Sequence, residues 1–214
     1  MKTLIVTGSD TGVGKTVVCA MLTLALEGIY CKPIQSGTAG GTDTQRVQAM
    51  TNLPASHFLP ERYVLRTPIS PHRAAELDGI TIELESLDLV HAPAGRLLIV
   101  EGAGGVLVPI NRQNLQIALF SRWRAPVIVV ARTTLGTINH TLLTLEALKH
   151  HAIEVTGIIF VGDAMPDTER TIAEFGAAKI LGRLPILPAL DAGALHDAFN
   201  AHFDRRDFER GDGG

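Results

Sequence analysis

Short, almost uninterrupted apolar runs recur along the chain, and most are followed by a longer stretch with helical periodicity. The apolar runs predict strands at residues 3–7, 29–34, 97–101, 126–131, 155–161 and 180–182. The intervening pattern predicts helices at residues 16–26, 43–50, 73–77, 82–90, 115–123, 135–151, 167–175 and 192–203. Strands that are apolar on both faces and alternate with helices are typical of a parallel sheet covered on both sides. We therefore expect an α/β fold with a mostly parallel sheet and helices on both of its faces.

Nothing in this pattern divides the chain into separate units. We find no internal repeat, no low-complexity segment and no linker, so residues 1–204 are expected to form one domain. Residues 205–214 are polar and rich in glycine, which predicts a flexible C-terminal tail.

Composition and charge narrow the class of protein. The 214 residues are 46% hydrophobic, which is enough for a folded domain with a substantial core. The net charge of −3 gives no broad basic surface, so neither nucleic acid nor a membrane is an expected partner. Cys19 and Cys31 fall in predicted core elements and are expected to be buried thiols. No apolar run approaches about 18 residues, and the N-terminus begins directly with a strand, so we expect a cytoplasmic protein.

The first strand leads into a glycine-rich loop, Gly-Ser-Asp-Thr-Gly-Val-Gly-Lys-Thr at residues 8–16, and then into a helix. Strand, loop, Gly-Lys-Thr and helix together are the layout of a phosphate-binding loop (P-loop), in which backbone amides and the helix N-terminus surround phosphate oxygens. Ser9 stands where the common pattern has its first glycine. The alternative to a phosphate-binding loop is a chance glycine-rich turn between a strand and a helix. The loop predicts a P-loop NTPase-like fold that binds nucleotide through residues Asp10, Thr11, Gly12, Val13, Gly14, Lys15, Thr16 and Val17.

Three oxygen-bearing side chains are candidate ligands for the Mg²⁺ that accompanies a nucleoside triphosphate. Thr16 supplies the P-loop hydroxyl, Glu101 ends an apolar strand, and Asp43 follows a flexible loop after the second strand. Alternatively, Glu101 is a solvated carboxylate and Asp43 only caps a helix.

Other polar residues at strand ends are candidates for substrate contacts. Lys32 lies within an apolar strand, so its ammonium group either reaches solvent at the strand end or meets an anion there. Ser36 and Thr11 are candidates for hydrogen bonds to a substrate. For His72 and His140 we favour packing or capping roles over catalysis. The P-loop, Lys32 and Glu101 all fall at carboxyl ends of predicted parallel strands, where such sheets bind ligands.

Five motifs spread over most of the chain resemble the dethiobiotin synthetase family. They are the P-loop itself, Cys-Lys-Pro-Ile-Gln-Ser-Gly at 31–37, Ser-Pro-His at 70–72, Val-Glu-Gly-Ala-Gly-Gly at 100–105 and Leu-Gly-Thr-Ile-Asn-His at 135–140. The resemblance implies a homodimeric enzyme of biotin synthesis that uses ATP, Mg²⁺ and CO₂ to close a cyclic urea on 7,8-diaminononanoate. The implied reaction passes through a carbamate and a carbamic-phosphoric anhydride.

The resemblance also implies roles for single residues. Lys15 and Lys32 are the catalytic cations, Thr16, Asp43 and Glu101 hold Mg²⁺, and Thr11 and Ser36 contact the carbamate or the diamine. A second set of contacts is implied for the substrate's carboxylate tail, which the neighbouring subunit receives at Gly136, Thr137 and Asn139. The alternative for Thr137 and Asn139 is helix capping alone.

Two positions depart from the family pattern. Gly12 replaces a glutamate that some members carry, so no carboxylate is expected there to orient an amine. Gly162 stands where some members have an asparagine that reads adenine. We expect backbone groups at Gly162 and Pro185 to contact the base instead, and the sequence leaves the choice of base open.

Three other protein classes share parts of this pattern but fit the chain less well. Partition and cell-division ATPases usually carry an additional lysine early in the P-loop, where this chain has Ser9, Asp10 and Thr11. The amidotransferase-linked cyclisation enzymes of cobalamin synthesis need a glutaminase domain, for which this chain is too short. A module that only binds nucleotide would not need Lys32, Asp43 and Glu101 together.

Overall fold

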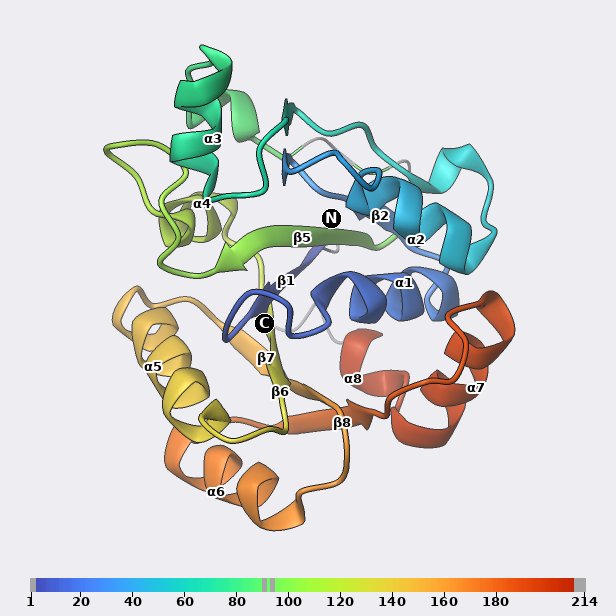
Figure 1. Cartoon of the computed structure of the whole chain (residues 1–214). Helices are drawn as coiled ribbons and strands as arrows, with labels where there is room; N and C mark the ends of the chain where they lie inside the picture. Colours follow the sequence, from blue (N-terminus) through green and yellow to red (C-terminus); the bar gives the residue numbers. More distant parts are fainter. Residues whose placement is uncertain (1–2, 90–91, 93–94, 210–214) are drawn as a thin grey trace.

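A six-stranded parallel sheet forms the centre of the computed structural model, which describes residues 3–89, 92 and 95–209. The strands lie in the order β2-β5-β1-β6-β7-β8 (Figure 1). Their bounds are β1 Thr3–Gly8, β2 Ile29–Cys31, β5 Leu98–Gly105, β6 Val127–Arg132, β7 Val155–Val161 and β8 Ile180–Leu184. Every neighbouring pair is parallel, as the apolar runs predicted.

Helices cover both faces of this sheet (Figure 1). One face carries α1 (Lys15–Ala25), α2 (Asp43–Thr51), α7 (Ala192–His202) and α8 (Arg206–Glu209). The opposite face carries α3 (Pro71–Asp78), α4 (Gln116–Trp123), α5 (Thr137–His150) and α6 (Pro166–Gly176). The predicted α/β class with helices on both faces is therefore confirmed.

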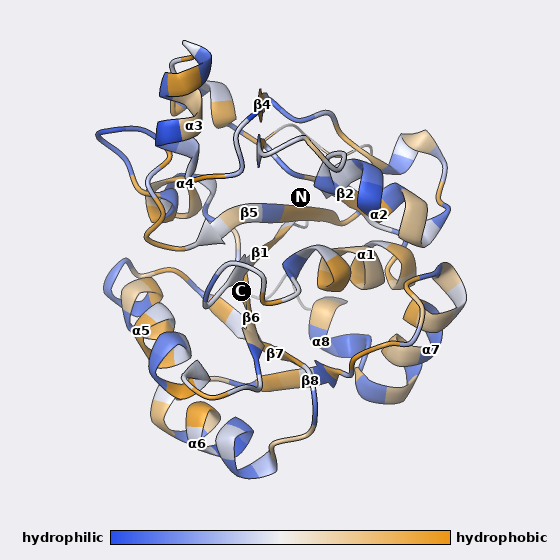
Figure 2. Cartoon of the chain, viewed as in Figure 1, coloured by the Kyte–Doolittle hydropathy of each residue, from blue (hydrophilic) through white to orange (hydrophobic). Residues whose placement is uncertain are grey.

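Strand β1 shows why its sequence is apolar at every position. Leu4 and Val6 pack into the core under α1, whereas Ile5 between them packs into the core on the opposite side. Because both faces are buried, the strand does not need the polar alternation of a half-exposed sheet. The hydropathy colouring shows mostly hydrophobic strands between helices that mix hydrophobic and hydrophilic residues (Figure 2).

The predicted strand at 29–34 is two strands. Strand β2 ends at Cys31, and β3 (Ile34–Ser36) leaves the main sheet to pair in parallel with β4 (Tyr63–Leu65). Pro33 lies between them and has no amide hydrogen to donate to a ladder. Its carbonyl oxygen instead accepts hydrogen bonds from the backbone amides of Arg62 and Tyr63, which directs the chain toward β4.

The helix predicted over 82–90 is wrong for the described residues, since only the 3₁₀ turn η2 (Glu85–Leu87) forms there; residue 90 lies outside them. The Ser86 hydroxyl donates to the carbonyl oxygen of Glu83 and contacts the Tyr63 hydroxyl at 2.7 Å. Such side-chain bonds to nearby backbone compete with helix formation. A second 3₁₀ turn, η1 (Ala55–His57), lies in the segment 53–66 that we expected to be irregular.

The C-terminal segment also differs from expectation. Within the predicted tail, residues 206–209 form α8, and Phe208 is 3% exposed. Its ring lies 5.8 Å from the ring of Phe199 and 6.4 Å from that of Phe203, centroid to centroid. Aromatic packing therefore orders a segment whose polar composition predicted flexibility, while residues 210–214 lie outside the described part.

The fold gathers the carboxyl ends of β1, β5, β6 and β7 at one edge of the sheet, where the P-loop and the segment after β5 meet. Both cysteines are free and buried, as predicted. Within the described ranges, no helix combines the length and apolar character needed to cross a bilayer.

Candidate active site

The P-loop has the backbone conformation that its glycines predict. Gly12 and Gly14 have φ angles of 71° and 98°, in the left-handed region that favours glycine. Gly14 precedes the first residue of α1, and a Cβ on Gly8 would lie 2.7 Å from Val13 Cγ2. The loop is thus tightly folded between β1 and α1, with the helix N-terminus at Lys15 as expected.

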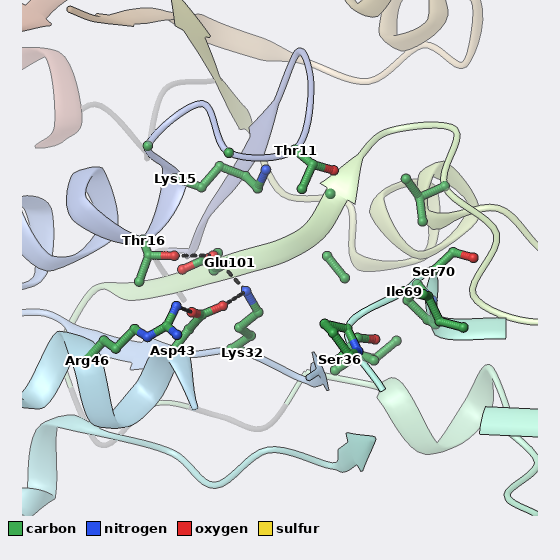
Figure 3. A pocket seen from close by; sticks show the side chains of 18 of the residues that line it. Thr11, Lys15, Thr16, Lys32, Ser36, Asp43, Arg46, Ile69, Ser70 and Glu101 are labelled. Carbon is green, nitrogen blue, oxygen red and sulfur yellow. Dashed lines mark hydrogen bonds and ion pairs between the residues drawn. The ribbon is translucent and has the colours of Figure 1, made fainter. Parts of the chain in front are cut away.

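A cavity of about 610 Å³ opens beside this loop (Figure 3). Its wall brings together ten of the predicted site residues: Thr11, Gly12, Gly14, Lys15, Thr16, Val17, Lys32, Ser36, Asp43 and Glu101. These residues come from the P-loop, α1, the β2–β3 segment, α2 and β5. Residues far apart in the sequence therefore share one site at the carboxyl edge of the sheet.

Lys32 forms ion pairs with two carboxylates of the protein. Its ammonium group donates to Glu101 Oε1 at 2.7 Å and makes a short hydrogen bond to Asp43 Oδ2. Lys32 is only 6% exposed, so the side chain is buried rather than extended to solvent. Burial alone would lower the pKa of Lys32, but the carboxylates of Glu101 and Asp43 outweigh it and raise that pKa. Lys32 is therefore a charged ammonium at neutral pH.

Glu101 is the best-connected carboxylate of the site. Its Oε1 also accepts a hydrogen bond from the Thr16 hydroxyl at 3.0 Å, and its Oε2 accepts one from the Tyr30 hydroxyl at 2.8 Å. Glu101 is 1% exposed, which rules out the alternative of a solvated strand-end carboxylate. Burial and the charge of Glu101 raise the pKa of Tyr30 well above its usual range, so Tyr30 stays protonated and donates.

Lys15 lies inside the P-loop. Its ammonium group donates to the backbone carbonyl oxygen of Asp10 at 2.9 Å, and the residue is 7% exposed. Burial lowers the pKa of Lys15, while the nearby charge of Glu101 opposes that shift. Figure 3 shows the amino groups of Lys15 and Lys32 on two sides of the same space, with Thr16 and Glu101 beside it.

Asp43 is not the cap of α2, so the alternative that it only caps a helix is wrong. It is the first residue of α2, but the cap is Thr42, whose hydroxyl accepts from the amide of Gln45. The Asp43 carboxylate is free to bind Lys32 and also accepts from Arg46 at 3.2 Å. Asp43 therefore lines the cavity beside Lys32, and its role as a Mg²⁺ ligand stays a prediction.

Arg46 and an apolar part of the wall were not predicted from the sequence, nor was Tyr30, which lies outside the wall and donates to Glu101. Arg46 follows Asp43 by three positions, which places both on one side of α2 at the rim of the cavity. Tyr30 precedes Lys32 by two positions, and the period of an extended strand could have placed both on one face. An apolar part of the wall consists of Ile34, Pro68, Ile69 and Val108. No motif identified that part.

Two buried polar atoms next to this wall have no hydrogen-bond partner among the described residues, Ser36 Oγ and His72 Nδ1. Ser36 lines the cavity, and the backbone amide of His72 donates to the carbonyl oxygen of Pro109. A buried hydroxyl without a partner is a candidate for contact with a ligand.

Within the described part of the chain, the cavity wall does not include Asp10, Val13, Gly136, Thr137, Asn139, Gly162 or Pro185. Asp10 accepts from the Thr11 amide at 2.7 Å and pairs with Arg132 at 2.7 Å. Gly162 lies near the P-loop, because a Cβ at Gly14 would contact the adjacent Val161. The carbonyl oxygen of Gly162 already accepts from Arg183. Their contacts with nucleotide remain predictions.

The segment 136–139 lies at the start of α5, outside the cavity wall. Gly136 has a φ of 92° and provides no side-chain cap. The Thr137 side chain is buried, with its hydroxyl 3.3 Å from that of Thr141, whereas Asn139 is exposed. Any anion contact of Thr137 would therefore have to come from its backbone.

The side chains present fit a Mg²⁺ ion that also binds phosphate oxygens. Thr16, Asp43 and Glu101 offer hydroxyl and carboxylate oxygens, which are the hard ligands that Mg²⁺ prefers. The described residues contain no cluster of three or more His, Cys, Asp or Glu side chains able to hold a metal ion. A site with two carboxylates and one hydroxyl suits a cation that arrives with a nucleotide.

Solved structures that resemble this one are P-loop ATPases. They include a ParA family ATPase from Chlorobium tepidum TLS, with a TM-score of 0.54 and 14% identity, covering 94% of this chain and 91% of that chain. The septum site-determining protein MinD from Pyrococcus horikoshii OT3, complexed with Mg-ADP, has a TM-score of 0.55 and 11% identity, covering 92% and 93%. At these identities the likeness concerns the fold alone, and it confirms the P-loop NTPase-like architecture.

Sequence relatives are more specific. Residues 2–194 match the family AAA_26, an AAA domain. An ATP-dependent dethiobiotin synthetase BioD from Rhodopseudomonas palustris (strain TIE-1) is 51% identical over 205 residues, 96% of each chain. One from Novosphingobium aromaticivorans is 51% identical over 208 residues, covering 97% of this chain and all of the relative. The chain therefore belongs to the ATP-dependent dethiobiotin synthetases, a family of enzymes.

Proposed function

We propose that this enzyme converts 7,8-diaminononanoate, CO₂ and ATP into dethiobiotin, ADP and phosphate, a step of biotin synthesis. The observation that carries the proposal is the convergence of Lys15 and Lys32 with Thr16 and Glu101 on one cavity beside the P-loop. A module that only binds nucleotide needs the P-loop lysine but not a second buried ammonium group next to it.

The proposed reaction has three steps. One amine of the diamine attacks CO₂ and loses a proton, which forms a carbamate. A carbamate oxygen then attacks the γ-phosphorus of ATP, the bond to ADP breaks, and a carbamic-phosphoric anhydride results. The second amine attacks the carbonyl carbon of the anhydride, phosphate leaves with the bonding electrons, and loss of a proton completes the cyclic urea.

Two ammonium groups suit this chemistry. A carbamate is a weak anionic nucleophile, and the phosphoryl group gathers negative charge during its transfer, so fixed cations stabilise both. Lys15 would contact the outer phosphates, and Lys32 would lie between them and the carbamate. Because the second attack joins groups of one molecule, much of the rate should come from positioning.

Mg²⁺ would be held by Thr16, Asp43 and Glu101 together with phosphate oxygens, and it would neutralise part of the phosphate charge. For Asp43 and Glu101 to bind it, each must share or release its contact with Lys32. This exchange would free the Lys32 ammonium group for the carbamate.

The apolar part of the wall suits the hydrocarbon chain of the diamine. Ile34, Pro68, Ile69 and Val108 offer methyl and methylene surface to it, next to the hydroxyl of Ser36. We propose that Ser36 and Thr11 supply hydrogen bonds to the carbamate or the diamine. The unpartnered Ser36 hydroxyl supports this role.

We also propose a homodimer in which residues Gly136–Asn139 of one subunit receive the substrate carboxylate bound by the other. Exposed amides at a helix N-terminus bind carboxylates well. Leu135 is fully exposed and Leu143 is 61% exposed, which gives this region apolar surface for a second copy. Light scattering should give twice the chain mass, and Leu143→Glu should reduce it to one chain mass; a wild-type monomer would contradict the dimer.

The test of the proposed function is product formation. The protein is incubated with diamine, bicarbonate and Mg²⁺, with ATP or one of the other triphosphates, and dethiobiotin is measured by mass spectrometry. Dethiobiotin should form with ATP, and the other triphosphates report the base preference that Gly162 and Pro185 leave open. Arg170→Met, an exposed change on α6, is the matched control for Lys32→Met and should retain activity. Absence of dethiobiotin with every triphosphate would contradict the proposal.

We place this reaction in the cytoplasm, where ATP and the diamine are available.

A further inference from the structure

Tyr30 lies at the middle position of β2 and is completely buried, although its side chain carries a polar hydroxyl. The ring packs edge-on against Phe58, with 6.5 Å between ring centroids. Its hydroxyl donates to Glu101 Oε2 at 2.8 Å. Tyr30 does not belong to the described wall of the cavity, and its hydrogen bond to Glu101 connects it to the site.

The two oxygens of Glu101 have different neighbours. Oε1 accepts from Thr16 and Lys32, whereas Oε2 accepts from Tyr30. The terminal torsion of a glutamate is soft and rotates readily when nothing holds it. A hydrogen bond to Oε2 from a rigid, buried ring fixes this torsion and leaves Oε1 directed toward Thr16.

The backbone supports the same arrangement. Strand β2 pairs directly with β5, and Tyr30 is in register with Ile99, two positions before Glu101. The phenol and the carboxylate therefore extend from neighbouring strands that are joined by ladder hydrogen bonds. Such second-layer partners orient metal-binding side chains in many proteins.

We infer that Tyr30 is a positioning residue, which holds the Glu101 carboxylate in the orientation that presents Oε1 to the Mg²⁺-nucleotide. This inference rests on the proposed function, because it assumes that Glu101 serves the metal. It adds a residue outside the cavity to the groups that determine metal-dependent nucleotide binding.

Calorimetry of ADP binding, with and without Mg²⁺, separates this role from a purely structural one. Tyr30→Phe removes one oxygen and keeps the ring. We expect it to reduce the Mg²⁺-dependent gain in ADP affinity by about tenfold, the lower end of the effect of such partners. Metal-free ADP affinity should stay within about twofold of wild type. Phe58→Leu alters the same aromatic contact without touching Glu101, so it should retain the full gain.

Glu101→Ala keeps the inference distinct from the proposed function. If Glu101→Ala abolishes the Mg²⁺-dependent gain and Tyr30→Phe leaves it unchanged, only the inference is overturned. It is also overturned if Tyr30→Phe lowers metal-free and metal-dependent binding equally. If Glu101→Ala itself leaves the gain unchanged, the metal assignment in the proposed function fails and the inference fails with it. The double variant should lose no more than Glu101→Ala alone.

Discussion

The ammonium group of Lys32 lies 2.7 Å from Glu101 Oε1, and both residues are almost fully buried. With Asp43 on its other side, Lys32 forms a cluster with two carboxylates, and Lys15 lies on the wall of the same cavity. The Lys32 ammonium group would not be stable at this depth without a carboxylate, nor the Glu101 carboxylate without a cation. The residues predicted to bind Mg²⁺ and the residue predicted to bind the carbamate are thus already joined within the protein.

The two lysines should affect stability in opposite directions. Lys32→Met would leave the buried Glu101 carboxylate without its cation, whereas Asp43 would keep Arg46, and removing one partner of a buried pair costs about 3–5 kcal/mol. Lys15→Met would remove a buried charge whose hydrogen-bond partner among the described residues is a carbonyl oxygen, so the free energy of unfolding should equal or exceed that of wild type. Urea unfolding without nucleotide measures both variants. A Lys32→Met protein as stable as wild type would contradict the ion cluster.

The stability contributed by each lysine should also depend differently on pH. The folded-state pKa of Lys32 is raised above the unfolded value of 10.5, so its contribution is complete below that pH and is lost as pH rises through the folded-state pKa. The folded-state pKa of Lys15 is lowered, so the native protein releases that proton first, and stability rises with pH between the two values.

Wild type and Lys15→Met should therefore converge in stability as pH rises toward the unfolded value of 10.5, because the folded state then no longer contains a buried charge at Lys15. Urea unfolding at several pH values measures the difference. A gap between the two proteins that widens over this range would show that the direction assigned to Lys15 is wrong.

Gly14→Ala should abolish nucleotide binding. The change places a Cβ 3.0 Å from Val161 Cγ1 at a φ of 98°, so the loop must shift. Gly79→Ala is a matched control: its φ is 68°, and apart from its chain neighbours no atom of the described residues lies within 4 Å of a Cβ there. Both variants should lose about 1 kcal/mol or more of stability to left-handed strain. Only Gly14→Ala should lose ADP affinity in calorimetry, and normal affinity would contradict the tight loop.

Ser36→Ala should raise the KM for the diamine by about fivefold, because a buried hydroxyl bond to a ligand is worth about 1 kcal/mol. The KM for ATP should stay unchanged, since the proposed contact is with the diamine or its carbamate. Thr38→Val, two residues on and outside the described cavity wall, serves as control. An unchanged diamine KM in Ser36→Ala would remove Ser36 from the substrate site.

Phe208→Ala should destabilise the protein by about 3 kcal/mol, as expected for a buried phenylalanine. The ring packs against Phe199 and Phe203 beneath α1, so its loss leaves a cavity. Arg206→Ala, on the exposed side of α8, should change stability by less than about 0.5 kcal/mol. If the two variants were equally stable, the prediction of a flexible tail from composition would be correct instead.

Local signals predicted most of the central sheet and its helices. The apolar runs located all six strands of the main sheet, because strands buried on both faces have no polar positions to obscure them. The split at Pro33 and the loss of the helix at 82–90 depended on partners far along the chain, Arg62 and Tyr63. Such long-range hydrogen bonds leave no periodic signal in the sequence.

Part of the candidate site was also predicted from the sequence. Lys32, Asp43 and Glu101 were identified because charged residues at strand ends beside a P-loop are conspicuous. Tyr30 was missed because an aromatic residue within an apolar strand is indistinguishable from core. The mutual contact of Lys32 with both carboxylates was also not predicted, because it depends on how β2, α2 and β5 are placed in space.

The most direct test of the account uses ¹³C-labelled bicarbonate. The enzyme is incubated with unlabelled 7,8-diaminononanoate, Mg²⁺ and ATP, and dethiobiotin and ADP are quantified by mass spectrometry and chromatography. We predict one ¹³C atom in each dethiobiotin and one ADP formed for each product molecule. ADP formation without labelled dethiobiotin would contradict the claim that Lys15 and Lys32 hold a triphosphate beside a carboxylated amine.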